Sequence, residues 1–261
     1  MKRIVVAIYW FVLASGIAAG QAMAADLPVP APAYYPVAAV YDWGGGYIGI
    51  NGGYAFGQSQ WGSDPLNPSH QSSTGNFNVN GGLFGATMGV SGQWGAWVFG
   101  VEGDFDWQDV SGTSGSTFCT SLIISTAIGA KAAGLGCKTK STWVGTLRPR
   151  FGYAWNRVLF YGTAGAAGAN VQTGLNGLPA QTNAEFGWTA GAGVEVAVAE
   201  NWTFKVEYLF VDLANVSCNH GYSCGYDVAA ANATTPARNS NMTVQLNENI
   251  IRAGLNFKFG H

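Results

Sequence analysis

The stretch Trp97–Gln108, with the sequence WVFGVEGDFDWQ, decides the fold class because large apolar side chains alternate in it with acidic and amide side chains. One set of alternate positions is apolar and holds Trp97, Phe99, Val101, Phe105 and Trp107. The other set holds Glu102, Asp104, Asp106 and Gln108. Successive side chains of a β-strand point to opposite faces, so this period of two predicts a strand with one apolar and one polar face.

Similar alternation recurs along the chain and predicts eight strands. They span residues 46–57, 80–94, 97–108, 141–154, 158–171, 185–198, 202–213 and 244–259. The fifth strand is rich in Ala and Gly, so its sequence does not decide which of its side chains face outward. Tight turns near 95–96, 155–157 and 199–201 separate long connections at 58–79, 109–140, 172–184 and 214–243. Short turns on one rim and long loops on the other are typical of bacterial outer-membrane barrels. The sequence therefore predicts an all-β fold, an eight-stranded antiparallel transmembrane β-barrel with short periplasmic turns and long extracellular loops.

The charged residues separate this barrel from a soluble sandwich or lipocalin, whose strands would alternate in the same way. The polar faces of the predicted strands carry charges of both signs, at Glu102, Asp104, Arg148, Arg150, Glu195, Lys205, Glu207 and Arg252. Such charges are costly in a dry soluble core, but they can pair inside a barrel whose apolar face meets lipid. Aromatic residues near the strand ends fit interfacial girdles, at Trp94, Trp97, Trp107, Trp143, Tyr153, Trp155 and Trp202.

Composition agrees with a membrane barrel and excludes several other classes. Only 10% of the 261 residues are charged, against about 25% in soluble domains, while 48% are hydrophobic. The formal net charge of −2 offers no basic patch for phosphates, so nucleic acid is not an expected partner. Beyond the N-terminal segment, the richest apolar stretch, 122–130, is too short for a transmembrane helix, which needs about 20 residues.

The N-terminal segment has the features of an export signal. Lys2 and Arg3 precede an uncharged apolar stretch, and the small-residue site Ala22–Ala24 follows it. This pattern predicts a signal peptide at 1–24, with a retained membrane anchor as the alternative. Four prolines between residues 28 and 36 keep the next segment out of a sheet. We therefore expect a Pro/Ala-rich periplasmic lead-in at 25–42 and the outer-membrane barrel at 43–261.

Neither the histidines nor the cysteines indicate catalysis or a cofactor. The histidines, at positions 70, 220 and 261, all lie outside the predicted strands, so an enzyme is not expected and no cofactor or metal is predicted. Four cysteines in an exported chain favour disulfides, with three connectivities available. Pairing within each long loop is the simplest, Cys119 with Cys137 and Cys218 with Cys224. A metal cluster at Cys218, His220 and Cys224 would lack a fourth ligand.

Several motifs resemble a known family. They are the start Ala24–Pro28 with its Pro/Ala-rich spacer, the motif Tyr41–Gly49 (YDWGGGYIG), the stretch Arg150–Trp155 (RFGYAW) and the ending Glu248–Phe259 (ENIIRAGLNFKF). Together they resemble the small outer-membrane immunogenic proteins of alphaproteobacteria, porin-family barrels related to the membrane domain of outer membrane protein A and to opacity proteins. The resemblance covers the whole chain after the signal peptide and implies the outer membrane of a Gram-negative bacterium as location.

The resemblance also implies partners. Family members usually end on an aromatic residue, which resembles the signal that the barrel assembly machinery reads during biogenesis. Here Leu255, Phe257 and Phe259 resemble that signal, but Gly260 and His261 follow them, so the signal is slightly displaced. Outer-membrane lipid and lipopolysaccharide are the expected surroundings, and an extracellular ligand of unidentified class could bind the loops.

Two functions compete at this point. The first is a non-enzymatic barrel that contributes to envelope structure and to surface interaction through antigenic loops. The alternative is a small porin that passes ions or small solutes. An eight-stranded barrel has room for little more than its own side chains, and opposed charges would plug it, which favours the first function.

Overall fold

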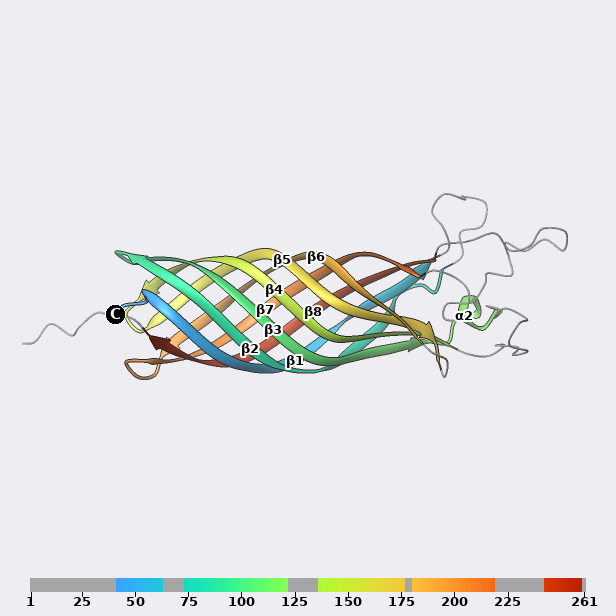
Figure 1. Cartoon of the computed structure of the whole chain (residues 1–261), viewed down its shortest axis with the longest axis horizontal. Helices are drawn as coiled ribbons and strands as arrows, with labels where there is room; N and C mark the ends of the chain where they lie inside the picture. The colour runs from blue at the N-terminus through green and yellow to red at the C-terminus, as the bar shows by residue number, and fades with distance from the viewer. Residues whose placement is uncertain (1–40, 63–72, 122–135, 177–179, 219–241, 260–261) are drawn as a thin grey trace, which may run out of the picture. The chain divides into compact units, whose positions relative to one another are not determined.

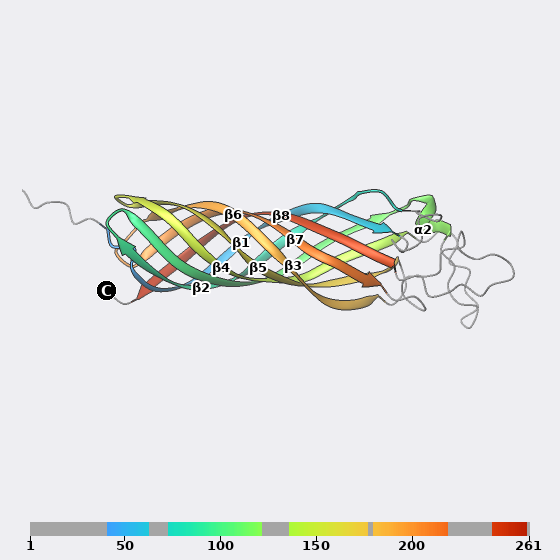
Figure 2. The same cartoon turned by 90° about the horizontal axis from the view of Figure 1, so that it is seen from above.

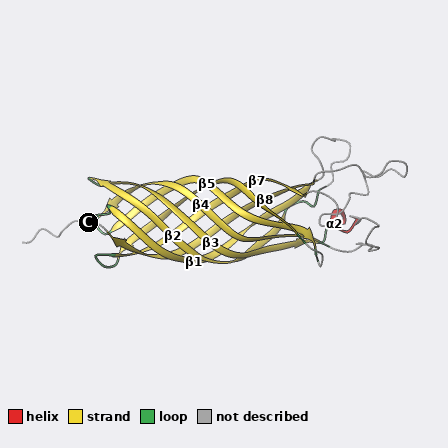
Figure 3. Ribbon diagram, viewed as in Figure 1, coloured by secondary structure: helices red, strands yellow, loops and turns green. Residues whose placement is uncertain are grey.

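The computed structural model describes residues 41–62, 73–121, 136–176, 180–218 and 242–259, which form one closed antiparallel barrel (Figure 1). The strands are β1 (Gly45–Gly62), β2 (Phe77–Trp94), β3 (Trp97–Ser114), β4 (Cys137–Trp155), β5 (Val158–Leu175), β6 (Gln181–Ala197), β7 (Trp202–Cys218) and β8 (Met242–Phe259). Each strand pairs with its chain neighbours, and β8 pairs with β1 to close the sheet. The short helix α2 (Thr117–Ser121) lies at one end of the barrel (Figure 3).

The predicted fold class and strand count are confirmed. Both views of the barrel show strands inclined to its axis, with tight turns at one end (Figure 2). Among the described residues, no helix is long and apolar enough to cross a membrane. The predicted signal peptide at 1–24 and residues 25–40 of the lead-in lie outside the described residues.

The strands are longer than predicted at the end away from the tight turns. A tilted membrane strand needs about 9–11 residues, whereas these have 17–19. The predicted long loop 172–184 is therefore wrong, because β5 continues to Leu175 and β6 begins at Gln181. Gln172 and Thr182 pair in this extension. Above the bilayer both faces of a strand can be polar, so the apolar alternation ends before the pairing does.

The outward face of the barrel is an apolar belt. Its exposed side chains include Ile50, Phe84, Met88, Phe99, Leu147, Phe151, Val206, Ile251 and Leu255. The sequence of β5 did not decide which of its side chains face outward. In the structure Phe160 faces outward, and Leu159 and Tyr161 are buried. A continuous belt of this kind is what a membrane barrel presents to lipid.

Side chains fill the inside of the barrel in three layers. An ionic layer occupies the middle. Toward the α2 end lies the upper apolar cluster, which includes Trp61, Val79, Leu83, Val110, Phe118, Val144, Val171, Leu175, Val211, Leu213, Val244, Leu246 and Ile250. At the end with the tight turns lies the lower apolar cluster of Tyr41, Trp43, Val98, Ala154, Leu159, Tyr161 and Ala197. By the layout of outer-membrane barrels, the tight turns mark the periplasmic rim and α2 the extracellular rim.

Candidate functional site

Arg148 is at the centre of the ionic layer. It lies opposite Glu102 in the β3–β4 pairing, and its side chain is fully buried. One guanidinium nitrogen contacts Glu102 Oε1 at 2.9 Å and Asp104 Oδ2 at 2.7 Å, and another contacts Glu207 Oε1 at 3.2 Å. One cation therefore holds carboxylates from β3 and from β7, on the other side of the lumen.

Two further cations, one from β7 and one from β8, also contact the carboxylates of β3 across the lumen. Lys205 Nζ contacts Glu102 Oε1 at 2.9 Å. Arg252 binds Asp104 Oδ1 at 2.9 Å, Asp106 Oδ2 at 2.5 Å and Glu207 Oε2 at 2.7 Å. These contacts place charge-assisted hydrogen bonds across the barrel rather than along one wall.

Arg150 forms the periplasmic side of the layer. It binds Glu195 Oε2 at 2.6 Å and Glu102 Oε2 at 3.2 Å. Its guanidinium lies 4.0 Å from the centre of the Tyr161 ring and 5.6 Å from that of Tyr47. The Tyr47 hydroxyl donates to Glu102 at 2.8 Å, and the Tyr161 hydroxyl donates to Glu207 at 3.1 Å. Both tyrosines thus combine ring contact with a hydrogen bond.

Two inward-facing glycines make room for these tyrosines. Gly89 pairs with Tyr47, and Gly193 pairs with Tyr161. A Cβ on Gly89 would overlap the Tyr47 hydroxyl, and one on Gly193 would lie 2.5 Å from the Tyr161 hydroxyl. Each ring therefore depends on the missing side chain of its cross-strand neighbour.

The structure brings all eight charged residues predicted for the interior into one network, and it adds members that the sequence analysis did not assign to it. The additions include Asp106, Tyr47 and Tyr161. Tyr47 could have been found from strand parity, because it alternates with the outward-facing Ile48 and Ile50. Tyr161 could not be found in this way, because the sequence of β5 does not decide which of its side chains face the lumen.

Glu248 lies apart from the cations. It is buried on β8 and accepts bonds from Gln108 Nε2 at 3.2 and 3.3 Å. Gln108 also donates to Ser141 at 2.6 Å. Within the described ranges, no group of three or more His, Cys, Asp or Glu side chains is arranged to hold a metal ion.

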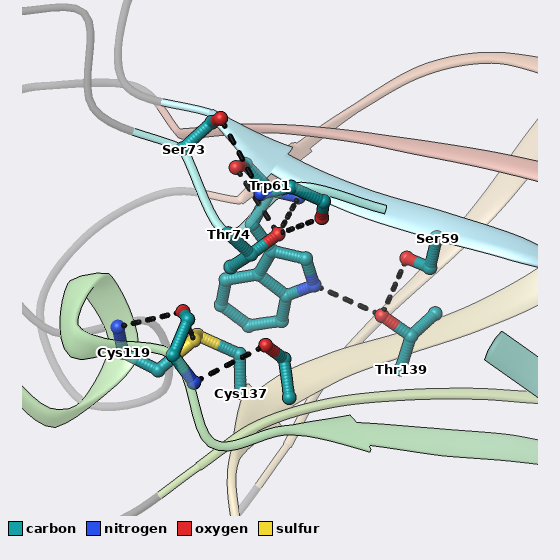
Figure 4. Close-up of a disulfide and its surroundings, with 10 residues drawn as sticks. Ser59, Trp61, Ser73, Thr74, Cys119, Cys137 and Thr139 are labelled. Atoms are coloured by element: carbon teal, nitrogen blue, oxygen red, sulfur yellow. Dashed lines mark hydrogen bonds between the residues drawn. A yellow bond between two sulfur atoms is a disulfide. The ribbon is translucent and has the colours of Figure 1, made fainter. Parts of the chain in front are cut away.

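A disulfide lies at the extracellular end of the lumen. Cys119 in α2 is bonded to Cys137, and both are fully buried in the upper apolar cluster. Figure 4 shows the Trp61 indole beside this disulfide, and its N–H donates to Thr139 Oγ1 at 2.9 Å. Phe118 of α2 packs in the same cluster. The disulfide thus ties the helix to the barrel mouth.

The positions of the cysteines differ in part from the prediction. Cys137 is the first residue of β4 rather than a loop residue, because pairing with Ser114 extends the strand. Cys218 ends β7, and Cys224 lies outside the described residues, so their predicted bridge stays a prediction. The three histidines also lie outside the described residues.

The periplasmic mouth is covered by residues that precede β1. The Trp43 backbone N–H donates to Gln93 Oε1 at 2.7 Å, and the Trp43 indole N–H donates to the Asn156 carbonyl at 3.3 Å. Lys258 Nζ donates to the Asp42 carbonyl and lies 4.7 Å from the centre of the Tyr41 ring. Burial there raises the pKa of Tyr41 to about 12. Tyr41, at the end of the predicted lead-in, therefore packs against the barrel, and the backbone carbonyl of Asp42 is bonded to it.

The predicted assembly signal lies on the outer surface of β8. Leu255, Phe257 and Phe259 all face outward and are more than a third exposed. The Phe257 ring contacts Trp202 of β7 with centroids 5.2 Å apart. Gly260 and His261 lie outside the described residues.

A closed eight-stranded barrel with an apolar belt and a charged interior defines an outer-membrane β-barrel protein. The chain belongs to the family described as outer membrane protein beta-barrel domain, whose model matches residues 12–259. This family places the protein in the outer membrane of a Gram-negative bacterium.

Named relatives agree with this family. The chain is 34% identical to the 31 kDa outer-membrane immunogenic protein of Brucella melitensis over 256 residues, covering 92% of this chain and 95% of the relative. It is 32% identical to the 25 kDa outer-membrane immunogenic protein of Brucella canis over 243 residues, covering 92% and 90%. Among solved structures, Neisserial surface protein A matches with a TM-score of 0.41 at 12% identity, covering 82% of this chain and 97% of that one.

Proposed function

We propose that the protein is a non-conducting, non-enzymatic barrel that strengthens the outer membrane and presents its extracellular side for surface contact. The observation that carries the proposal is the ionic layer. Arg148 and Arg252 both link carboxylates of β3 to Glu207 of β7, so charged side chains cross the lumen between the two apolar clusters. Ions would have to displace these buried pairs to pass.

The two apolar clusters support a closed lumen on either side of that layer. On the extracellular side, Trp61 and Leu246 are almost completely buried. On the periplasmic side, Trp43 is 3% exposed. Apolar packing on both sides of the charges supports a closed lumen and disfavours the alternative of a small porin.

A structural role also fits the chemistry of the interior. The carboxylates that could serve as acids or bases, such as Glu102 and Asp104, are each held by buried cations. Charge pairing accounts for them without a reaction. The relatives are named immunogenic, and we extend surface exposure of the loops to this chain as part of the proposal.

Liposome swelling tests the function. Proteoliposomes that contain the refolded protein should swell in isosmotic arabinose or glycine no faster than protein-free liposomes, while a general porin reconstituted at the same density swells rapidly. A cell that lacks the protein should leak periplasmic enzymes and become more sensitive to detergent, and the wild-type gene should restore it. Solute-dependent swelling of the wild-type protein would favour the porin.

A further inference from the structure

We propose that Lys138 and Lys140 form a binding site for the phosphate groups of a glycolipid in the outer leaflet. The inference rests on the outer-membrane location and not on the closed lumen. Both lysines lie on β4, two residues apart, so their side chains leave the same face of the strand. Their neighbours Cys137, Thr139 and Ser141 are buried inside, so that face is the outer one.

These two lysines are unusual for their position. In the described part of the chain, Arg148, Arg150, Lys205, Arg252 and Lys258 have buried side chains, and Arg157 lies in the β4–β5 turn. Among the lysines and arginines of the described strands, Lys138 and Lys140 are therefore the two whose side chains face outward. Placing both on one strand at one rim concentrates positive charge on one side of the barrel.

The aromatic residues beneath fix the level of the lysines. Phe84, Trp107, Phe105 and Trp143 form a chain of ring contacts on the outer wall, with centroids 5.1 to 5.5 Å apart. Aromatic residues of membrane proteins gather at the bilayer interface. Lys140 comes three residues before Trp143, toward the extracellular rim. With about 3.3 Å per residue and a tilt of about 40°, Lys140 lies about 8 Å above Trp143 and Lys138 about 13 Å.

At these heights Lys140 lies at the outer edge of the headgroups and Lys138 about 5 Å beyond it, close enough for a long lysine side chain to extend back to them. The polar region of a bilayer is about 5–8 Å thick on each side, and lysine side chains extend toward it from either direction. The lysines lie at the extracellular rim, so the headgroups within reach are those of the outer leaflet, which in Gram-negative bacteria is built of phosphorylated glycolipid. An ammonium group on a long stem is a point charge suited to phosphate. The aromatic chain offers an apolar surface for the acyl chains below.

The charges near the lysines leave room for an anion. Lys140 contacts Asp109 at 2.8 Å, and this pair is exposed, with 34% of the lysine and 78% of the aspartate side chain accessible. Exposed pairs of this kind are weak and exchange readily. Lys138 forms no ion pair with any described residue. The patch therefore keeps a net positive charge beside Asp109.

Binding of purified lipid A to the refolded protein in detergent, followed by native mass spectrometry, tests the proposal. Each lysine near an anionic membrane surface contributes about fivefold in affinity, so Lys138→Gln with Lys140→Gln should weaken binding of bisphosphorylated lipid A about 25-fold. Lys138→Arg with Lys140→Arg should keep it. Arg157→Gln removes an exposed cation from the opposite rim and should change it less than twofold. Removing the phosphates from lipid A should weaken its binding to the wild type at least as much as the double Gln substitution weakens binding of intact lipid A.

Folding of each variant is checked by its shifted gel mobility without heating. Should the double variant fail to fold, Lys138→Gln alone, which breaks no ion pair, should still weaken binding about fivefold. Equal binding of lipid A to wild type and to the folded Gln variant would overturn the proposal. Equal binding of phosphatidylglycerol and lipid A by the wild type would also overturn it, because the site would then recognise a phospholipid. Neither result bears on conductance, so the closed lumen stands or falls separately.

Discussion

Glu102 of β3 and Arg148 of β4 lie directly opposite each other in the barrel wall, and their side chains meet inside the lumen at 2.9 Å. The same carboxylate also accepts from Lys205, which comes from the other side of the barrel. A pair that joins neighbouring strands is thus extended into a bridge across the interior. This bridge makes the closure of the lumen and the stability of the barrel depend on the same residues.

Replacing Arg148 with Ala should therefore lower stability. The change leaves Glu102, Asp104 and Glu207 with one cation fewer in a buried layer, and removal of one partner from such a network typically costs about 3–5 kcal/mol. The measurement is the urea unfolding midpoint in detergent micelles. Arg157→Ala, which removes an exposed arginine from the β4–β5 turn, is the control and should leave the midpoint unchanged. Equal midpoints for the two variants would show that the network contributes little.

The glycine next to Tyr47 gives a second prediction. In Gly89→Ala, the new methyl group would overlap the Tyr47 hydroxyl, so the ring must move away from Glu102 and Arg150. Overpacking of this kind costs about 1–3 kcal/mol and should lower the unfolding midpoint. The matched control is Gly92→Ala on the same strand, where nothing lies within 4 Å of the added atom. A loss of stability of the same size in both variants would indicate a general effect of glycine on β2.

The disulfide gives a third prediction. Peptide mapping without reductant should recover Cys119 linked to Cys137, and also Cys218 linked to Cys224. Replacing Cys119 and Cys137 with Ser should lower stability by about 3 kcal/mol, as expected for a bridge that closes a loop of 18 residues. The variant should still show the altered gel mobility of a folded barrel, because the eight-strand ladder does not need the bridge. A bridge between the two cysteine pairs, or free thiols at all four positions, would contradict the assignment.

Strand parity predicted the fold and the charged members of the ionic layer except Asp106, because a charge on the polar face of a membrane strand can point only inward. The upper apolar cluster could not be predicted in the same way. Leu209, Val211 and Leu213 share the inward parity of Lys205, but an apolar side chain is equally at home facing lipid. Their parity with Lys205 indicates the lumen, but only the closure of the barrel shows that they pack there as one cluster.

The extracellular strand ends were also hidden in the sequence. Above the bilayer, the hydrogen-bonded pairing of the strands continues, but the outward face need not be apolar, so the sequence shows no alternation there. The loop at 172–184 was therefore predicted too long. Cys137 was placed in a loop for the same reason. The packing of Tyr41 at the periplasmic mouth depends on Lys258, which is distant in sequence, and no local pattern indicates that contact.

Single-channel recording of the refolded wild-type protein beside Arg148→Ala, in planar lipid bilayers at neutral pH, tests the closed lumen most directly. The wild type should show no steady conductance, because buried ion pairs cross the barrel between two apolar clusters. Arg148→Ala should either open measurable channels, as water enters beside the unpaired carboxylates, or show the lowered unfolding midpoint predicted above. Steady, large channels in the wild type, unchanged in Arg148→Ala and accompanied by an unchanged midpoint, would contradict the closed lumen and identify the barrel as a porin.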